Sequence, residues 1–215
     1  MFWPGSQVAR RQSAKLLFRG SIPLLAFETM KEIEVKFKLK GPKVIKTKLK
    51  KIGAKFIKKV FEENLRFDDK KRRLKSKNFL LRLRKDDKIR LTFKDRKRYF
   101  PTINDDGLKV AEEIEIEVGD FKRMKRILEK LGFRVSSRYQ KMREIWHYKD
   151  LEIAIDKMPY LGYFLEIEGP SKNIKRIVAS LKLDLKNGIT KTYGNLWEEY
   201  RKKHKIRSGD MVFKK

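Results

Sequence analysis

The sequence predicts an α+β fold in which eight mainly antiparallel strands close into a barrel, or tunnel, with helices packed outside. Three observations support this prediction: a pair of motifs occurs twice, strand-like runs alternate apolar and polar residues, and the polar face of each run carries largely one charge sign. The chain has 215 residues and is 40% hydrophobic, so it can bury one sizeable core. A single domain built from two similar halves is therefore expected.

Internal repetition is the most informative feature of the chain. EIEVKF at 32–37 is followed by LKKIGAKF at 49–56, and EIEIEV at 113–118 is followed by LEKLGFRV at 128–135. Each second copy begins about 80 residues after the first. Because both halves continue with further strand-like runs, the chain is interpreted as two β-α-β-β-β units.

The individual elements follow from the spacing of apolar residues. Alternation predicts half-buried strands at 31–39, 57–67, 79–85 and 88–94 in the first half, and at 112–118, 134–148, 151–157 and 163–169 in the second. Helices are expected at 42–52, 120–131, 171–182 and about 192–204. The first two helices end before Gly53 and Gly132, which suit left-handed caps. Turn residues over 95–110 predict a long mobile loop.

Both ends of the chain are expected to lie outside a tunnel domain of residues 30–204. Residues 1–29 are basic and lack a periodic pattern, so they are interpreted as a disordered leader or as sequence upstream of a true start at Met30. Residues 205–215 are interpreted as a basic disordered tail. No apolar run is long enough to span a bilayer, so a cytoplasmic protein without a membrane partner is expected.

The balance of charge narrows the classes of function. The formal net charge is +29, from 57 Lys and Arg against 28 Asp and Glu. This excess indicates a polyanionic partner, which could be nucleic acid, a membrane surface or a phosphate-rich small molecule. The absence of cysteine excludes disulfides, thiolate metal sites and cysteine nucleophiles. Abundant Lys, Glu, Arg and Ile with few Gln is typical of heat-adapted proteins and predicts a thermophilic source.

The polar faces of the predicted strands separate by charge sign. The basic positions are Arg82, Arg84, Arg90, Lys94, Lys141 and Arg143, and the acidic positions are Glu32, Glu34, Glu113, Glu115, Glu117, Glu152, Asp156, Glu166 and Glu168. Exposure to solvent would explain the charged face of any single strand. A solvated surface, however, tends to intersperse positive and negative side chains. Since helices would cover the apolar faces, the charged faces are expected to turn inward.

Acids and bases enclosed together fit a metal-bound triphosphate. Carboxylates two residues apart on a strand can share one hard cation, and they repel each other unless a positive charge neutralises them. Arginine and lysine side chains match a chain of phosphates. Nucleic acid is disfavoured as a partner because the carboxylates would repel its phosphodiester backbone.

The motifs at these positions resemble those of CYTH proteins, which belong to the triphosphate tunnel metalloenzyme superfamily. The Glu-x-Glu-x-Lys signature of that family stands here as Glu32, Glu34 and Lys36. The later matching runs are LLRLR, RLTFK, EEIEIEV, KMR and IAIDKMPYLGYFLEIEG, and the resemblance extends from about Met30 to Trp197. It implies an eight-stranded antiparallel tunnel with inward-facing acids and bases.

The resemblance also implies roles for individual residues. Mg²⁺ or Mn²⁺ would be held by Glu32, Glu34, Glu166 and Glu168, with support from Asp156 and from Glu113 or Glu115. The phosphates would be bound by Lys36, Arg82, Arg84, Lys94, Lys141 and Arg143. A further hypothesis makes Lys94 or Lys141 catalytic, because an ammonium among basic neighbours could help to deprotonate the attacking group. An unchanged pH–rate profile after substitution by Met would remove that hypothesis.

Several substrates remain open within this interpretation. DKMPYLGYFLEIEG looks most like the class IV adenylyl cyclase branch, which converts ATP to cyclic AMP and pyrophosphate. Other members of the family hydrolyse inorganic tripolyphosphate or thiamine triphosphate, so a triphosphatase is the alternative, and a non-catalytic polyphosphate- or nucleotide-binding module is another. EENLRFDD and the 95–110 loop depart from the family pattern, which leaves the substrate undecided. Net charge alone supports a nucleic-acid binder, and a homodimer stays open.

Aromatic residues have simpler explanations than ligand binding. Trp146 and Tyr148 are expected to pack under a helix rather than to stack on a base. Trp197 is expected on the apolar stripe of a helix that closes the barrel. His147 and His204 show no metal-ligand spacing.

Overall fold

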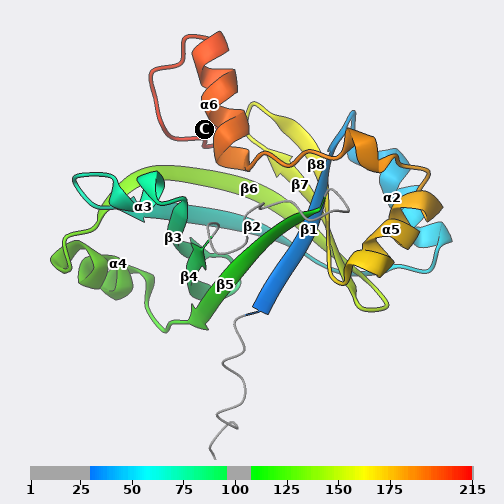
Figure 1. Cartoon of the computed structure of the whole chain (residues 1–215), viewed down its shortest axis with the longest axis horizontal. Helices are drawn as coiled ribbons and strands as arrows, with labels where there is room; N and C mark the ends of the chain where they lie inside the picture. The colour runs from blue at the N-terminus through cyan, green and yellow to red at the C-terminus, as the bar shows by residue number, and fades with distance from the viewer. Residues whose placement is uncertain (1–29, 96–107, 215) are drawn as a thin grey trace, which may run out of the picture.

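A closed barrel of eight strands forms the centre of the molecule (Figure 1). The computed structural model describes residues 30–95 and 108–214. Neighbouring strands are antiparallel throughout, in the closed order β1-β5-β4-β3-β2-β6-β7-β8. Helices α2 to α6 lie outside the barrel in Figure 1, which confirms the predicted fold class.

The two sequence repeats form interlocked halves of the barrel. The first half contains β1 (Met30–Leu39), α2 (Pro42–Lys51), β2 (Lys55–Asp68), α3 (Arg73–Ser76), β3 (Phe79–Lys85) and β4 (Ile89–Asp95). The second half contains β5 (Lys109–Glu117), α4 (Phe121–Lys130), β6 (Arg134–Tyr148), β7 (Leu151–Met158), β8 (Gly162–Glu168), α5 (Ser171–Ser180) and α6 (Tyr193–Lys203). Strand β1 pairs with both β5 and β8, and β2 pairs with β6, so neither half closes by itself.

All predicted strands and helices are present with closely similar boundaries. Gly53 and Gly132 have φ of 82° and 90°, the left-handed conformation expected where α2 and α4 end. Among the described residues, the additional elements are α3 and the 3₁₀ turn η2 (Leu185–Asn187), which are too short to show a periodic pattern. In the part of the chain that the structure describes, no helix is long and apolar enough to cross a membrane.

The predicted loop at 95–110 is shorter than expected at both ends. Asp95 belongs to β4, and Lys109 and Val110 belong to β5, because these residues complete the pairing between the two strands and with β1. The middle of the predicted loop, residues 96–107, lies outside the described residues. The predicted leader, residues 1–29, also lies outside them.

The apolar faces of the strands point outward and hold the helices. Val35, Ile153 and Ile167 on the barrel pack with Leu49 of α2 and Ile174 of α5 in one buried cluster. Removal of these side chains from water stabilises the attachment of both helices. Trp146 belongs to the same cluster, as expected for a residue that packs under a helix. A second cluster holds α4 against β2 and β3.

Helix α6 packs at one end of the barrel. Its buried Trp197 lies in a third cluster with Met158, Leu161, Phe164 and Met211. Phe164 lies directly opposite Asp156 and Lys38 in the neighbouring strands, so it faces the barrel interior. The packing agrees with the expectation that Trp197 belongs to a helix closing the barrel.

The prediction of a disordered tail is wrong for residues 205–214. Met211 donates its backbone N–H to the Arg138 carbonyl and accepts from the Gln140 N–H, both at 2.9 Å. Its side chain is only 1% exposed. The segment is held by one buried side chain and by backbone pairing with β6, neither of which produces a periodic pattern. Lys215 lies outside the described residues.

Candidate functional site

The inner face of the barrel is lined by charged side chains. Strand alternation places the core residue Val35 outside and the adjacent Lys36 inside. Directly opposite residues of paired strands share a face, so Glu166 lies on the inner side across from Lys36, and Glu168 across from Glu34. Five predicted site residues are at most 8% exposed: Lys36, Arg82, Lys94, Lys141 and Asp156. Burial of this many charges is tolerated only if they are paired.

Ion pairs join β1, β6, β7 and β8 in a first charge network. Arg143 donates from Nε to Asp156 Oδ1 and from Nη2 to Asp156 Oδ2, both at 2.7 Å, and Nη2 also donates to Glu166. Lys36 Nζ lies 2.8 Å from Glu166 Oε1. Lys141 Nζ lies 3.1 Å from Asp156 Oδ2. We define the first charge network as Lys36, Glu62, Lys141, Arg143, Asp156 and Glu166.

Glu62 of β2 is a member of this network that sequence reasoning missed. It lies opposite Lys141, with its carboxylate 3.4 Å from Lys141 Nζ and 3.6 Å from Arg143 Nε, and it is 1% exposed. Burial alone would raise the pKa of Glu62, but Lys141 and Arg143 outweigh burial and lower the pKa to about 2. Strand parity could have identified Glu62, because it shares its face with Asn64 at the polar positions of β2.

Tyr193 connects α6 to the first charge network and was also missed. Its hydroxyl donates to Asp156 Oδ2 at 2.9 Å, and Lys36 Nζ lies 4.4 Å from the centre of its ring. Burial and the neighbouring Asp156 raise the pKa of Tyr193 well above its ordinary value, so the hydroxyl keeps its proton. No sequence signal points to this role, because Tyr193 lies in a helix whose only clear pattern is amphipathic.

A second charge network lies on β3, β4 and β5. Glu115 accepts from Arg84 Nη2 at 3.0 Å, and Arg82 Nη2 lies 3.5 Å from the same carboxylate. Lys94 Nζ lies 2.7 Å from Glu113, and Arg82 Nη2 lies 3.7 Å from Glu113. Residues predicted to bind phosphate and residues predicted to support the metal therefore neutralise each other here.

The two lysines considered for catalysis have carboxylate partners. Lys94 pairs with Glu113, and Lys141 lies between Asp156 and Glu62. Each lysine shares its carboxylate with a basic neighbour, since Arg143 also contacts Asp156 and Arg82 also lies near Glu113. The hypothesis of a catalytic lysine therefore stays a prediction. Both lysines nevertheless point into the enclosed interior, where an ammonium can contact a phosphate.

The predicted metal ligands are partly brought together. Glu34 lies directly opposite Glu168 in the β1–β8 pair, and Glu166 is the next residue on the same face of β8. Glu32 belongs to β1, but its side chain lies outside the described part of the structure. Throughout residues 30–95 and 108–214, no three acidic or histidine side chains form a ready-made metal site. Glu166 instead contacts two bases, Lys36 and Arg143.

The available donors nevertheless fit a hard divalent cation. All of the predicted ligands are carboxylates, the oxygen donors that Mg²⁺ and Mn²⁺ prefer. Burial alone would raise the pKa of Glu166, but Lys36 and Arg143 hold this pKa well below its ordinary value, so the predicted ligand is ionised. Glu62 has a buried Oε2 without a hydrogen-bond partner among the described residues. A cation at Glu166 would have to replace contacts with Lys36 and Arg143.

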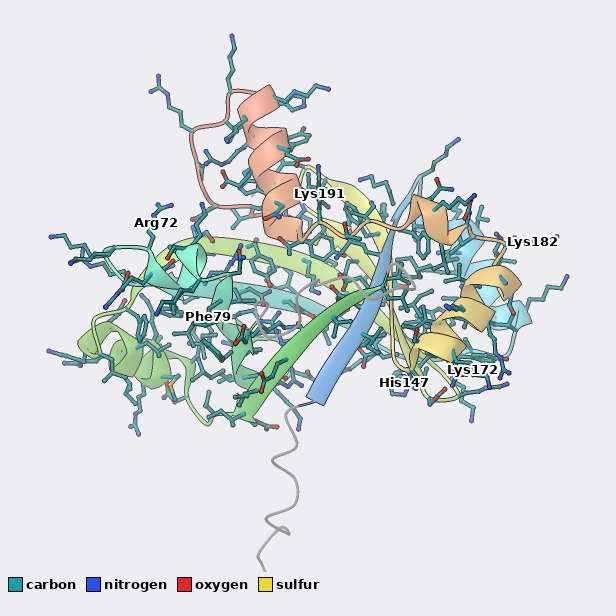
Figure 2. The ribbon with its side chains drawn as sticks, viewed as in Figure 1. Arg72, Phe79, His147, Lys172, Lys182 and Lys191 are labelled. Atoms are coloured by element: carbon teal, nitrogen blue, oxygen red, sulfur yellow. The ribbon has the colours of Figure 1, made fainter. Side chains whose placement is uncertain are left out.

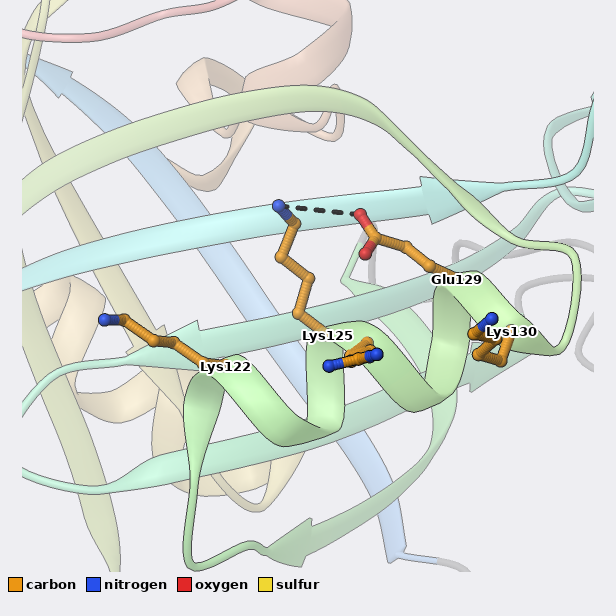
Figure 3. A pocket seen from close by; sticks show the side chains of 5 residues that line it. Lys122, Lys125, Glu129 and Lys130 are labelled. Carbon is orange, nitrogen blue, oxygen red and sulfur yellow. Dashed lines mark ion pairs between the residues drawn. The ribbon is translucent and has the colours of Figure 1, made fainter.

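A separate basic hollow lies on the exterior. It is lined by Lys122, Lys125, Arg126, Glu129 and Lys130, all from α4 (Figure 3). Lys125 and Glu129 form an ion pair of 3.5 Å along the helix. Exposed basic side chains occur elsewhere on the exterior too, such as those labelled Lys172, Lys182 and Lys191 in Figure 2. A hollow lined by one helix surface is not the enclosed site that the barrel interior provides.

The closed antiparallel barrel of eight strands places the chain in the class of tunnel-like barrel folds, which it shares with a solved Vibrio parahaemolyticus protein. Residues 30–193 match the family model of the CYTH domain, and the chain belongs to the CYTH family. Proteins of this family generally process triphosphate substrates and use divalent metals.

Individual relatives agree with this assignment. A Methanocaldococcus jannaschii protein, whose name assigns it provisionally as an adenylate cyclase, is 34% identical over 175 residues, which cover 76% of this chain and 97% of the relative. The solved PH1012 protein from Pyrococcus horikoshii is 27% identical, with a TM-score of 0.63 over 75% of this chain and 96% of that one. A Hippeastrum protein, described as an adenylyl cyclase candidate with a dominant triphosphatase activity, shares the fold at 16% identity, with a TM-score of 0.56 over 79% and 95% of the two chains.

Proposed function

We propose that this protein is a divalent-metal-dependent enzyme that acts on a triphosphate inside the barrel, with conversion of ATP to cyclic AMP and pyrophosphate as its reaction. The observation that carries the proposal is the first charge network, in which three carboxylates and three bases are enclosed together. Buried carboxylates would not help a protein to bind nucleic acid, because they repel the phosphodiester backbone. The name of the Methanocaldococcus jannaschii relative favours the cyclase over the alternatives.

Mg²⁺ or Mn²⁺ is the proposed cofactor, held by Glu34, Glu166 and Glu168 with Glu32. When bound, the ion would polarise phosphate oxygens and neutralise charge that develops during the reaction. On the protein side, Lys36, Lys141 and Arg143 would move from carboxylate partners to phosphate oxygens, as would Arg82, Arg84 and Lys94. In both networks the same bases would pair with carboxylates before substrate binds and with phosphate oxygens afterwards.

The proposed reaction needs no nucleophile from the protein. The ribose 3′-hydroxyl oxygen forms a bond to the α-phosphorus, the bond from that phosphorus to the bridging oxygen breaks, and pyrophosphate leaves with the electron pair. The hydroxyl proton passes to solvent. The enclosed bases position the phosphate chain for in-line attack and stabilise the added charge on its oxygens.

Product analysis tests this proposal directly. The full chain is incubated with ATP, inorganic tripolyphosphate and thiamine triphosphate in the presence of Mg²⁺ or Mn²⁺, and the products are separated. Cyclic AMP with pyrophosphate is expected, whereas release of orthophosphate would establish a triphosphatase instead. Tight binding without turnover would establish a binding module.

Variants connect the activity to the barrel interior. Glu166→Gln is expected to abolish turnover, because it removes one ionised ligand and the partner of two bases. The exposed Glu129→Gln on α4 makes the same chemical change outside the barrel and is expected to keep full activity. Equal activity of the two variants would contradict the proposed site.

A further inference from the structure

Buried polar atoms without a hydrogen-bond partner gather on one wall of the barrel interior. Among the described residues these atoms are Glu62 Oε2, Asn64 Nδ2 and Oδ1, Arg82 Nε, Arg84 Nε and Trp146 Nε1. All except the Trp146 nitrogen belong to the polar face of β2 and β3. Since nearly all buried polar groups in folded proteins are paired, such a concentration indicates where a ligand completes the hydrogen bonding.

Asn64 is the most exceptional member of this wall. Its side chain is 0% exposed, and neither polar atom of its amide has a hydrogen-bond partner within residues 30–95 and 108–214. It lies directly opposite Arg84 on β3 and opposite Tyr139 on β6. On β2 itself, Glu62 is the preceding residue on the same face. Unlike the arginines, Asn64 makes no compensating ion pair, so an unpaired amide here only lowers the stability of the empty protein.

We propose that Asn64 is a further substrate-binding residue, whose amide contacts the metal-bound phosphate chain. This inference rests on the proposed function and adds to the residues named there. The Nδ2 group donates to a non-bridging phosphate oxygen, beside Arg82 and Arg84, whose Nε–H groups also have no hydrogen-bond acceptor among the described residues. The Oδ1 atom accepts from a water molecule of the hydrated divalent ion.

The assignment to a metal-bound phosphate chain is supported by the presence of both donors and acceptors among these polar atoms. A bare polyphosphate offers only acceptor oxygens, which would leave the acceptor Asn64 Oδ1 without a hydrogen-bond donor. Divalent cations such as Mg²⁺ keep several waters when they bind phosphates, and those waters donate hydrogen bonds. A hydrated metal–triphosphate therefore satisfies both kinds of atom on this wall, whereas the anion alone satisfies one.

Substitution of Asn64 by the similarly sized Leu tests the proposal. Binding of two analogues that resist turnover, imidotriphosphate and α,β-methylene-ATP, is measured by calorimetry with Mg²⁺ and again with EDTA. With Mg²⁺, Asn64→Leu is expected to weaken both analogues about tenfold, and with EDTA only about threefold, because the contact with metal-bound water is then absent from both proteins. Without ligand, the melting temperature of Asn64→Leu is expected to equal or exceed that of the wild type, since an unpaired buried amide is gone.

Two further variants complete the experiment. Asn64→Asp keeps the acceptor but replaces the donor by an anion, so binding is expected to weaken more than in Asn64→Leu. The exposed Asn195→Leu on α6 is the matched control and is expected to bind like the wild type.

The outcomes separate this inference from the proposed function. Unchanged affinity in Asn64→Leu, or a melting temperature lowered by several degrees, overturns the assignment in favour of a structural role. Loss confined to α,β-methylene-ATP overturns it in favour of contact with the nucleoside. A loss that is equal with Mg²⁺ and with EDTA overturns the contact with metal-bound water. A wild type that binds neither analogue refutes the proposed function itself.

Discussion

Glu62 shows how a single residue in the barrel interior links stability to pH. Its folded pKa is about 2, below the ordinary value of 4.5, because Lys141 and Arg143 outweigh the effect of burial. A lowered pKa means that the stabilisation is present above about pH 4.5 and is lost as the pH falls through about 2. The shift corresponds to about 3 kcal/mol at neutral pH.

Glu62→Gln is expected to lower the free energy of unfolding at pH 7 by about 3 kcal/mol, because Lys141 and Arg143 lose a buried counter-charge. Urea denaturation at pH 7 and at pH 3 measures this effect. The difference between variant and wild type should shrink at pH 3, because Glu62 of the unfolded chain is then protonated while the folded carboxylate still has to stay ionised. A difference that is constant with pH would contradict the assignment of a low pKa to Glu62.

Tyr193→Phe isolates one hydrogen bond between α6 and the barrel. The phenylalanine ring keeps the packing but removes the donor to the Asp156 carboxylate. A loss of about 1.5–3 kcal/mol in the free energy of unfolding is expected, since the acceptor is charged and fully buried. Tyr200→Phe on the same helix provides a control and should cost less than about 0.5 kcal/mol. Equal effects of the two substitutions would refute the special role of Tyr193.

The C-terminal segment, residues 205–214, packs as part of the domain. Met211→Ala is expected to lower the free energy of unfolding by about 2–4 kcal/mol, because it leaves a cavity beside Trp197 in the third cluster. Thermal denaturation measures the change, with Lys214→Ala as a surface control. A melting temperature unaffected by Met211→Ala would support the disordered tail that the sequence suggested.

Strands and helices were predictable because their signals are local. Alternation along β1 and β5 and the glycines after α2 and α4 specify type and approximate boundaries without knowledge of the partner. The segment 205–214 was not predictable in the same way. Its order depends on contacts that Met211 makes with residues distant in sequence, and a single buried residue has no period.

The same distinction applies to the candidate site. Sequence analysis found Glu34, Lys36, Arg82 and the other alternating charges because charged residues recur at every second position, on one face of each strand. Glu62 and Asn64 lie in a strand of mixed charge, and Tyr193 lies on a helix, so only the closed barrel brings them to the interior. The partners of each charge were also not predictable, because they depend on the register between strands.

For the whole molecule, ligand binding should appear as thermal stabilisation. Mg²⁺ with tripolyphosphate at about 100 times its Kd is expected to stabilise the fold by about 2.7 kcal/mol. This corresponds to a rise of about 5–10 °C in Tm for a domain of this size. Scanning calorimetry of the wild type, Glu166→Gln and Glu129→Gln measures it. A rise of equal size in all three proteins would indicate that the ligand binds the basic exterior instead.

The closure of the barrel by β1 against β8 affects how the chain is made. On the ribosome, β1 emerges first and its final neighbour emerges after all the other strands. Until then the nascent chain carries a strand edge without its partner, the kind of surface that pairs with other chains. We therefore expect the barrel to close only after translation has finished. Folding is expected to be slow, because closure depends on contacts between strands distant in sequence.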